Sequence, residues 1–218
     1  MSNHFKELKK MHRELRSTYE ESFSIRIHRS LSWLKRAEKE TGDSDARFIF
    51  YWISLNSAYS MSDDFLAKTS AKKKFKVFCK KILMYGNEEI YEIIYDRFSE
   101  EIRSLMANKF ILPAYWHLKI KSMKVDRSSL TIERRNIRNA LKDKNQTHQI
   151  LNAVFTRLFV LRNQIFHGGS TWRGKLNRQQ VDDGASLLSH LIPIILTIMM
   201  ENPNEDWGDI AYPPTVDN

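Results

Sequence analysis

The chain has 218 residues, of which 42% are hydrophobic, enough to bury one core of good size. Seven glycines and five prolines are too few for the many turns of a β-rich domain, and the single cysteine, Cys79, excludes an internal disulfide. The formal net charge of +9 favours a polyanionic partner such as nucleic acid, although a basic, well-solvated surface has the same charge. No stretch alternates apolar and polar residues for long, so we predict an all-α protein.

Three helices are expected in the first part of the chain. Residues 3–22 carry a thin apolar stripe and predict a helical arm that packs on the domain or on a second subunit. Residues 22–40 form a second helix, and an aromatic-rich third helix follows at about 45–61, capped by Asp43 or Ser44. Asn56 lies in the middle of this third helix, where an inward-facing amide needs a hydrogen-bond partner.

The segment 61–145 is predicted to be a helical elaboration of the same domain. Its first helix is rich in lysine and is interrupted by Gly86 and Asn87. Cys79 lies on the apolar side of that helix without an evident histidine partner, so it is expected to fill the core. The helices expected here are 71–85, 88–108, 115–118 and 131–141.

The strongest helical signal of the whole chain runs from Ile150 to Gly169. Its apolar residues recur at steps of three and four, which places them on one stripe: Leu151, Val154, Leu158, Leu161 and Ile165. Gly168 and Gly169 supply left-handed backbone that ends helices. Just before this end the helix carries Arg162, Asn163 and His167, polar groups that are costly to bury unless they are paired or used.

A loop at 170–178 and a last helix at about 179–200 complete the domain, which is expected to span residues 1–202. The longest apolar run, 191–200, is too short to cross a bilayer and contains Pro193, so no membrane partner is predicted. The charged N-terminus lacks the apolar core of a signal peptide, and a cytoplasmic location is therefore expected. The acidic tail at 203–218 is expected to be weakly ordered or draped over the surface.

Several familiar sites are disfavoured by their context. The segment Gly169–Lys175 has the spacing of a phosphate-binding loop, but a helix rather than a strand precedes it and Leu176 replaces the Ser or Thr that ligates magnesium. The seven histidines form no pair at helical spacing and no cluster with cysteine or carboxylates. We therefore predict neither a metal nor a cofactor.

The remaining motif is Arg162-Asn163-x3-His167. In its setting, at the end of the strongest helix and before two glycines, it resembles the HEPN (higher eukaryotes and prokaryotes nucleotide-binding) family, whose active members carry Arg-x(4–6)-His, commonly with Asn after the Arg. The aromatic helix around Trp52–Tyr59 looks like the second helix of Apea-like members, and the resemblance covers about residues 22–60 and 148–200. Gly169 departs from the toxins paired with nucleotidyltransferases, which have a tyrosine there.

The resemblance implies a bundle of about five core helices with extra helices inserted in the middle and an N-terminal arm. It also implies metal-independent cleavage of RNA at a site shared by a homodimer, in antiviral defence or as a toxin. The partners that follow are RNA, a second copy of the chain, and a cognate antitoxin or sensor protein. The alternative within the resemblance is a non-catalytic module for RNA binding, dimerisation or assembly.

The chemistry of the three residues agrees with cleavage by a ribose 2′-hydroxyl. Imidazole titrates near neutral pH, so His167 can move a proton, while the guanidinium of Arg162 suits the charge on a phosphate. Asn163 is four residues before His167 and can orient its ring or bind phosphate. The competing structural interpretation pairs Arg162 with a carboxylate and leaves His167 as a cap of the helix. Further RNA contacts are assigned to Arg173, Lys175 and Asn56.

Overall fold

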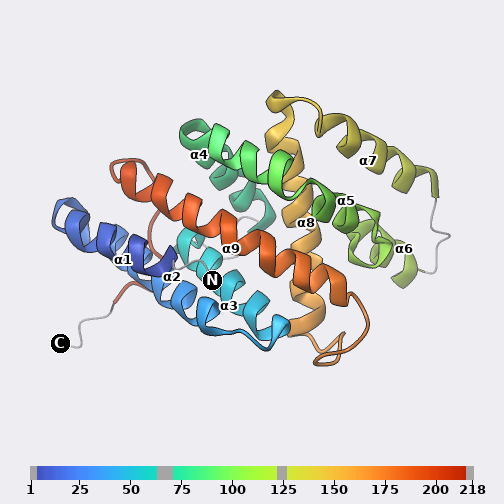
Figure 1. Ribbon diagram of the computed structural model, residues 1–218, viewed down its shortest axis with the longest axis horizontal. Helices are drawn as coiled ribbons and strands as arrows, with labels where there is room; N and C mark the ends of the chain where they lie inside the picture. The colour runs from blue at the N-terminus through green and yellow to red at the C-terminus, as the bar shows by residue number, and fades with distance from the viewer. Residues whose placement is uncertain (1–3, 63–70, 122–126, 215–218) are drawn as a thin grey trace.

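The computed structural model describes residues 4–62, 71–121 and 127–214, and within them the chain is all-helical, which confirms the predicted fold class (Figure 1). The β-structure of the described residues is limited to one isolated antiparallel bridge, between Met61 and Ile210. The nine α-helices of these residues are α1 (His4–Leu15), α2 (Glu21–Lys39), α3 (Ser44–Tyr59), α4 (Ala71–Glu92), α5 (Ser99–Ala107), α6 (Pro113–Ile120), α7 (Arg127–Ala140), α8 (Thr147–Phe166) and α9 (Arg178–Glu201).

The centre of the molecule is α9, the longest helix. It lies between the α1–α2–α3 group on one side and α4 and α5 on the other (Figure 1). Helices α2 and α3 form an antiparallel pair whose inner faces are fully buried with that of α9, for example at Ile27, Leu55 and Leu191. Burying each such side chain contributes about 1.5–3 kcal/mol, so this three-helix contact is the main support of the fold.

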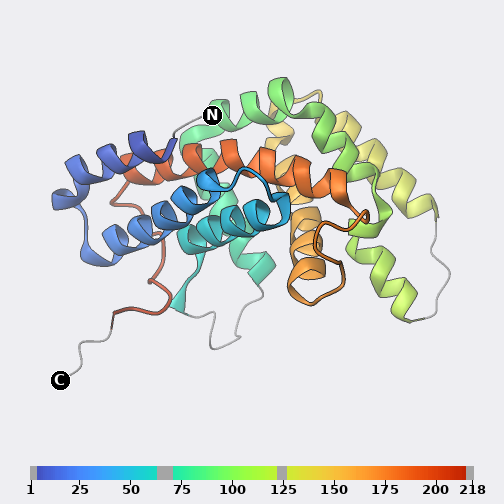
Figure 2. The ribbon, with the colours of Figure 1, turned by 60° about the horizontal axis from the view of Figure 1, so that its bottom comes forward.

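Helix α8 crosses this assembly and packs against α4, α5 and α7 (Figure 1). The predicted apolar stripe is confirmed, because Leu151, Val154, Leu158 and Leu161 are all buried and Ile165 is half-buried. Arg157 is also buried on this helix, which the stripe did not predict. The C-terminal end of α8 projects from the body of the molecule and is joined to α9 by a loop (Figure 2).

Helix boundaries differ from the prediction at several places, among them α4, which continues to Glu92 instead of ending at 85, and α7, which begins at Arg127 instead of 131. The first helix ends at Leu15 and continues only as a short 3-10 turn at Arg16–Thr18, since the chain must turn back into α2. Between α4 and α5 a π-helical turn at Ile93–Arg97 divides the expected helix 88–108. Gly86 leaves helical geometry (φ −141°, ψ 42°), but α4 resumes after it. A side chain at 86 would collide with Ile198 of α9, so the close approach of the two helices requires glycine here.

Helix α9 is the one helix of the described residues that is long and apolar enough to cross a membrane. In its most apolar window, 78% of the residues are buried inside the protein, as expected of a central core helix. Pro193 lies within α9 without ending it. Cys79 is buried in α4 as predicted, and burial raises the pKa of its thiol.

The C-terminal segment at 202–214 is draped over the surface and fixed there. Trp207 is 5% exposed, contacts Phe78 of α4, and donates its indole N–H to the carbonyl of Asn202 at 2.9 Å. Arg29 of α2 donates to the carbonyls of Ala211 and Tyr212, each at 2.7 Å. The described part of the acidic tail is thus draped over the surface, the second of the two alternatives expected from the sequence.

Candidate functional site at the tip of α8

The tip of α8 ends in a Schellman motif. Gly168 has φ of 68°, its N–H donates to the carbonyl of Ile165 at 3.2 Å, and the N–H of Gly169 donates to that of Gln164 at 2.7 Å. Only Gly168 adopts left-handed backbone, so the expectation that both glycines supply it is wrong for Gly169. His167 is the C-cap residue, and the motif fixes where its side chain leaves the helix.

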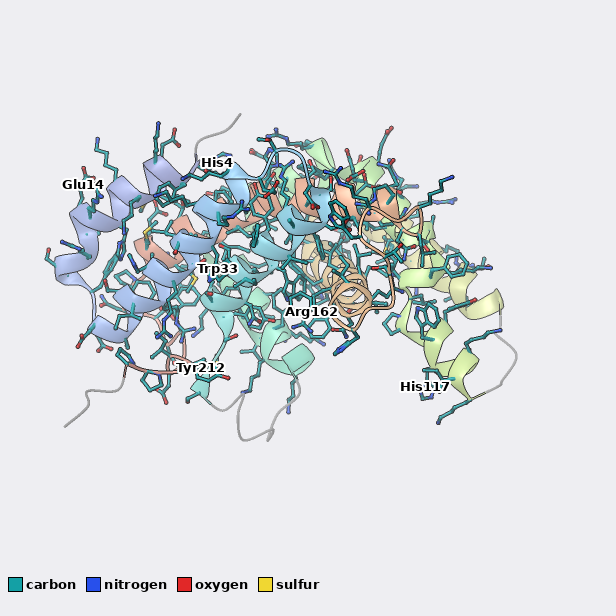
Figure 3. All side chains as sticks on the ribbon, turned by 90° about the horizontal axis from the view of Figure 1, so that it is seen from below. His4, Glu14, Trp33, His117, Arg162 and Tyr212 are labelled. Carbon is teal, nitrogen blue, oxygen red and sulfur yellow. The ribbon has the colours of Figure 1, made fainter. Side chains whose placement is uncertain are left out.

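Arg162 is half-buried one and a half turns before that end, and Figure 3 shows it where α8 is seen end-on. Its Nη1 donates to Asn163 Oδ1 at 2.9 Å, and its guanidinium lies 4.1 Å from the centre of the Phe166 ring. Its Nε is buried and has no hydrogen-bond partner among the described residues. The competing structural interpretation requires an ion pair between Arg162 and a carboxylate. Arg162 forms no such pair with a described residue.

His167 is exposed at the same tip. Its backbone N–H donates to the carbonyl of Asn163 at 3.0 Å, and its imidazole makes no hydrogen bond to any described residue. The amide oxygen of Asn163 accepts from Arg162, so Asn163 positions the arginine rather than the histidine ring. His167 does occupy the cap position of the structural interpretation, while its ring remains open to a ligand.

A chain of amide hydrogen bonds holds the tip against its neighbours. Gln164 donates to the carbonyl of Phe110 at 2.7 Å and accepts from Asn177 at 2.8 Å. Asn177 in turn accepts from Asn108 at 2.9 Å and adopts left-handed backbone, with φ of 55°, at the start of α9. The segment after α5, the tip of α8 and the start of α9 are thereby fixed to one another.

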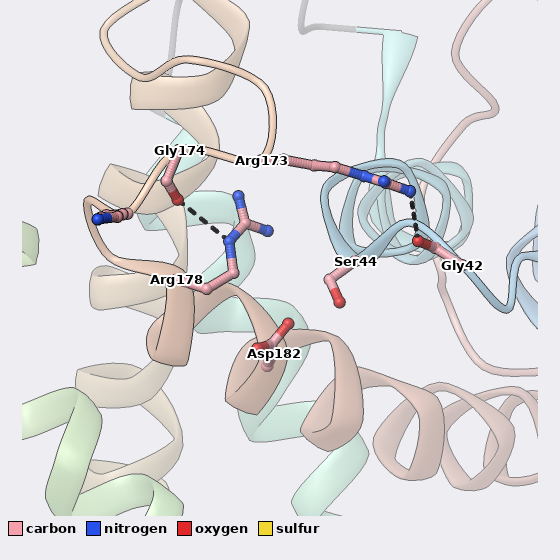
Figure 4. Close-up of a pocket in the computed structure, with 7 residues that line it drawn as sticks. Gly42, Ser44, Arg173, Gly174, Arg178 and Asp182 are labelled. Carbon is pink, nitrogen blue, oxygen red and sulfur yellow. Dashed lines mark hydrogen bonds between the residues drawn. The ribbon is translucent and has the colours of Figure 1, made fainter.

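The loop after the tip is anchored on the start of α3, as Figure 4 shows for Arg173 and Gly42. Arg173 donates its backbone N–H to Asp45 at 3.0 Å and a guanidinium N–H to the carbonyl of Gly42 at 2.8 Å. Arg178 forms an ion pair with Asp45 at 2.8 Å. The loop, the start of α3 and the start of α9 border a hollow of about 510 Å³. Its lining residues are Gly42, Ser44, Arg173, Gly174, Lys175, Arg178 and Asp182.

Asp43 serves both the helix and the loop. Its Oδ1 accepts from the N–H of Ala46 at 3.0 Å, which makes it the cap of α3, one of the two predicted candidates. Its Oδ2 accepts from the indole of Trp172 at 2.5 Å. The hydrogen bond from Ala46 is the largest of the effects that lower the pKa of this carboxyl. Lys175, by contrast, is exposed and makes no hydrogen bond to a described residue.

The structure therefore places most, but not all, of the predicted residues at the tip of α8 or in the loop that follows it. Arg162, Asn163 and His167 share the tip of α8, and Arg173 and Lys175 lie in the loop that follows it. Asn56 lies on an exposed face of α3 and needs no interior partner. It does not line the hollow at the loop. Nor does it line a second concave site, a groove that runs along α8.

That groove was not expected from the sequence. It has a volume of about 560 Å³ and is lined by Trp52, Phe75, Lys76, Pro113, Asn152, Ala153, Phe155, Thr156, Phe159, Val160 and Asn163. Three of its aromatic residues, Trp52, Phe75 and Phe155, are at the same time buried core residues. The available signal was the polar series Asn152, Thr156 and Asn163, which share one face of α8 at steps of four and seven.

No group of three His, Cys, Asp or Glu side chains in the described ranges is arranged to hold a metal ion. The tip of α8 offers a guanidinium, an amide and an imidazole, which are suited to binding a phosphodiester and transferring a proton. A comparison of the chain with family models, with curated proteins and with solved structures finds no match.

Proposed function

We propose that the chain is a metal-independent endoribonuclease of HEPN type, with a HEPN-like arrangement of its helices, that cleaves RNA in antiviral defence or as a toxin. The observation that carries the proposal is the state of Arg162 and His167. The arginine makes no ion pair with a described carboxylate, and the imidazole is exposed without a hydrogen bond to a described residue. The guanidinium of Arg162 and the imidazole of His167, both at the end of one helix, are therefore available to bind a phosphodiester.

In the proposed reaction the ribose 2′-hydroxyl attacks the adjacent phosphorus and the bond to the 5′-oxygen of the next nucleotide breaks. His167 accepts the proton of the hydroxyl or donates one to the leaving oxygen. Arg162 stabilises the charge on the phosphoryl oxygens, and Asn163 holds its guanidinium in place. The products are a 2′,3′-cyclic phosphate and a 5′-hydroxyl, so DNA is not a substrate.

A homodimer accounts for the need for two proton-transfer groups. Each chain supplies one histidine in this motif, and a two-fold axis beside the α8 tips would bring two imidazoles and two guanidiniums to one phosphodiester. The five-residue spacing puts Arg162 and His167 roughly 140° apart on an ideal helix, which favours residues of two chains acting together. A cognate antitoxin or sensor would act on the same tips.

The test is cleavage of single-stranded RNA in excess EDTA by the wild type, Arg162→Ala and His167→Ala. Each variant is expected to cut at least about 100-fold more slowly, the usual loss for a missing acid–base group or charge-stabilising donor. His148→Ala is the matched control, since His148 is an exposed histidine at the other end of α8. Wild-type rates in Arg162→Ala and His167→Ala would overturn the proposal.

The second candidate is an RNA-binding module without nuclease activity. Two arginine–aromatic stacks favour it: Arg162 lies over Phe166 at 4.1 Å and Arg173 over Trp172 at 4.7 Å, and the two aromatic side chains are 46% and 69% exposed. Such surfaces bind single strands by stacking and charge. Binding that weakens steeply with salt, without any strand scission, would select this candidate.

A further inference from the structure

The groove along α8 begins at the proposed catalytic residues. Asn163, whose amide oxygen accepts from Arg162, forms one end of its lining, and Asn152 lies at the other end. Eleven residues of helix separate the two, or roughly 16 Å at 1.5 Å per residue. A strand whose phosphate meets Arg162 would therefore have this groove directly beside it.

The lining combines flat apolar walls with a few polar groups. Four aromatic side chains contribute to it: Phe159 is half-buried, whereas Trp52, Phe75 and Phe155 are 3–7% exposed and also belong to the core. The ring centres of Trp52 and Phe159 lie 5.5 Å apart in an edge-to-face contact. The amide oxygen of Asn163 accepts from Arg162, and its amide N–H groups donate to no described residue. Asn152 uses an N–H on the carbonyl of His148 at 2.7 Å, which leaves its oxygen to accept.

Charge narrows the class of occupant. None of the described residues that line the groove is acidic, whereas Lys76 lines it and Arg162 adjoins it. An anionic occupant with a flat heterocycle and hydrogen-bonding edges matches these walls and charges, and a nucleotide is such a molecule. A second protein chain would match the apolar walls but leave the cations without a counterpart.

We infer that the groove binds an unpaired base of the RNA strand whose phosphodiester meets Arg162. This inference rests on the proposed function and deepens it by placing the base beside the cleaved bond. Stacking on aromatic side chains tolerates every base, so the groove selects single strands over duplexes. Asn152 and Asn163 add hydrogen bonds to the edge of the base.

The test measures binding without cleavage. The probe is a fluorescent single-stranded oligonucleotide of 2′-O-methyl RNA, which has no hydroxyl to attack, and its companion has the same backbone but no bases. The wild type is expected to bind the base-bearing strand at least about fivefold more tightly, the lower end of what one stacked base contributes. Ala153→Trp and Val160→Trp fill the groove from two positions and are expected to abolish this ratio.

Ser32→Trp is the matched control, an equal substitution at an exposed position of α2, and it is expected to keep the wild-type ratio. Circular dichroism checks that each variant folds, and two filling positions ensure that one folded variant remains. Equal binding of the two strands by the wild type would overturn the inference, as would a full ratio in a folded filled variant. A filled variant that dissociates a dimer while keeping the ratio would assign the groove to protein contact instead.

The two proposals fail separately. RNA cleavage with no preference for base-bearing strands would keep the nuclease and remove the groove. A base preference that the filled variants lose, without any cleavage by the wild type, would keep the groove and remove the nuclease.

Discussion

Two arginines on long helices of this protein have opposite surroundings. Arg26 of α2 is 1% exposed and donates to the carbonyls of Ala58, Ser60 and Gly208 at 3.0, 2.8 and 2.6 Å. Arg162 of α8 donates only to its neighbour Asn163 and lies over an aromatic ring. The first joins α2 to the end of α3 and to the C-terminal segment. The second uses little of its hydrogen-bonding capacity within the described fold, which makes it the one suited to a ligand.

The largest expected effect separates these two arginines by stability. Arg26→Leu leaves one buried and two half-buried carbonyls without their donor and is expected to lower the free energy of unfolding by about 3–5 kcal/mol. Arg162→Leu is expected to lower it by less than about 1 kcal/mol, because little structural bonding is lost. Urea denaturation at pH 7 measures both. Similar losses for the two variants would contradict the distinction.

A pair of tryptophans extends the comparison to packing. Trp207 of the C-terminal segment is 5% exposed and packs on Phe78 of α4, whereas Trp172 is 69% exposed in the loop after α8. Trp207→Ala is expected to lower the free energy of unfolding by about 3 kcal/mol through lost burial and a cavity. Trp172→Ala is expected to cost less than about 1 kcal/mol. An equal loss at both positions, in the same denaturation experiment, would show that the loop is part of the core.

Two histidines show the same contrast, because the imidazole of His12 is buried and that of His167 is exposed. His12 is buried between α1 and α2, and burial lowers its pKa to about 4, with the charge of Lys9 adding to the shift. The pKa of His12 is lower in the folded protein than in the unfolded chain. The free energy of unfolding is therefore highest above pH 6.5, where the imidazole is neutral in both states, and it decreases as the pH falls towards 4. The loss between pH 7 and pH 5 is expected to be about 2 kcal/mol.

Denaturation of His12→Leu over the same range checks this origin. The variant is expected to show a much flatter dependence, with a smaller slope left by His28 and His190, whose pKa values burial also lowers. A slope as steep as that of the wild type would assign the pH dependence to other groups.

The smallest expected effect concerns the turn that presents His167. Gly168 has left-handed backbone, so Gly168→Ala is expected to cost about 1 kcal/mol even though nothing lies within 4 Å of the added carbon. Gly42→Ala also has open space but ordinary backbone, and it is expected to change stability by less than about 0.5 kcal/mol. Equal effects in thermal unfolding would mean that the turn tolerates a side chain.

The sequence predicted the features that depend on local periodicity and capping. The stripe of α8, the cap at Asp43 and the core position of Cys79 all follow from spacing and residue type, and the structure confirms them. The path through Gly86 depended on an approach by Ile198, more than a hundred residues away in the chain, so no local pattern contained it.

The candidate site was predictable as a motif but not as a surface. Arg162, Asn163 and His167 are close in sequence, and the helix brings them to one tip. The groove needs α3, α4 and α6 beside α8, and only tertiary packing makes their aromatic residues into walls. That Asn163 accepts a hydrogen bond from Arg162, and does not orient the ring of His167, also depended on side-chain geometry.

The most direct test of the central claim is the identity of the cleavage product. A single-stranded RNA and the same sequence in DNA are incubated in excess EDTA with the wild type and with His167→Ala, and the new termini are analysed by mass spectrometry. The account predicts that the wild type cuts only the RNA and leaves a 2′,3′-cyclic phosphate, while His167→Ala is at least about 100-fold slower. Cleavage of the DNA, or full activity in His167→Ala, would contradict it.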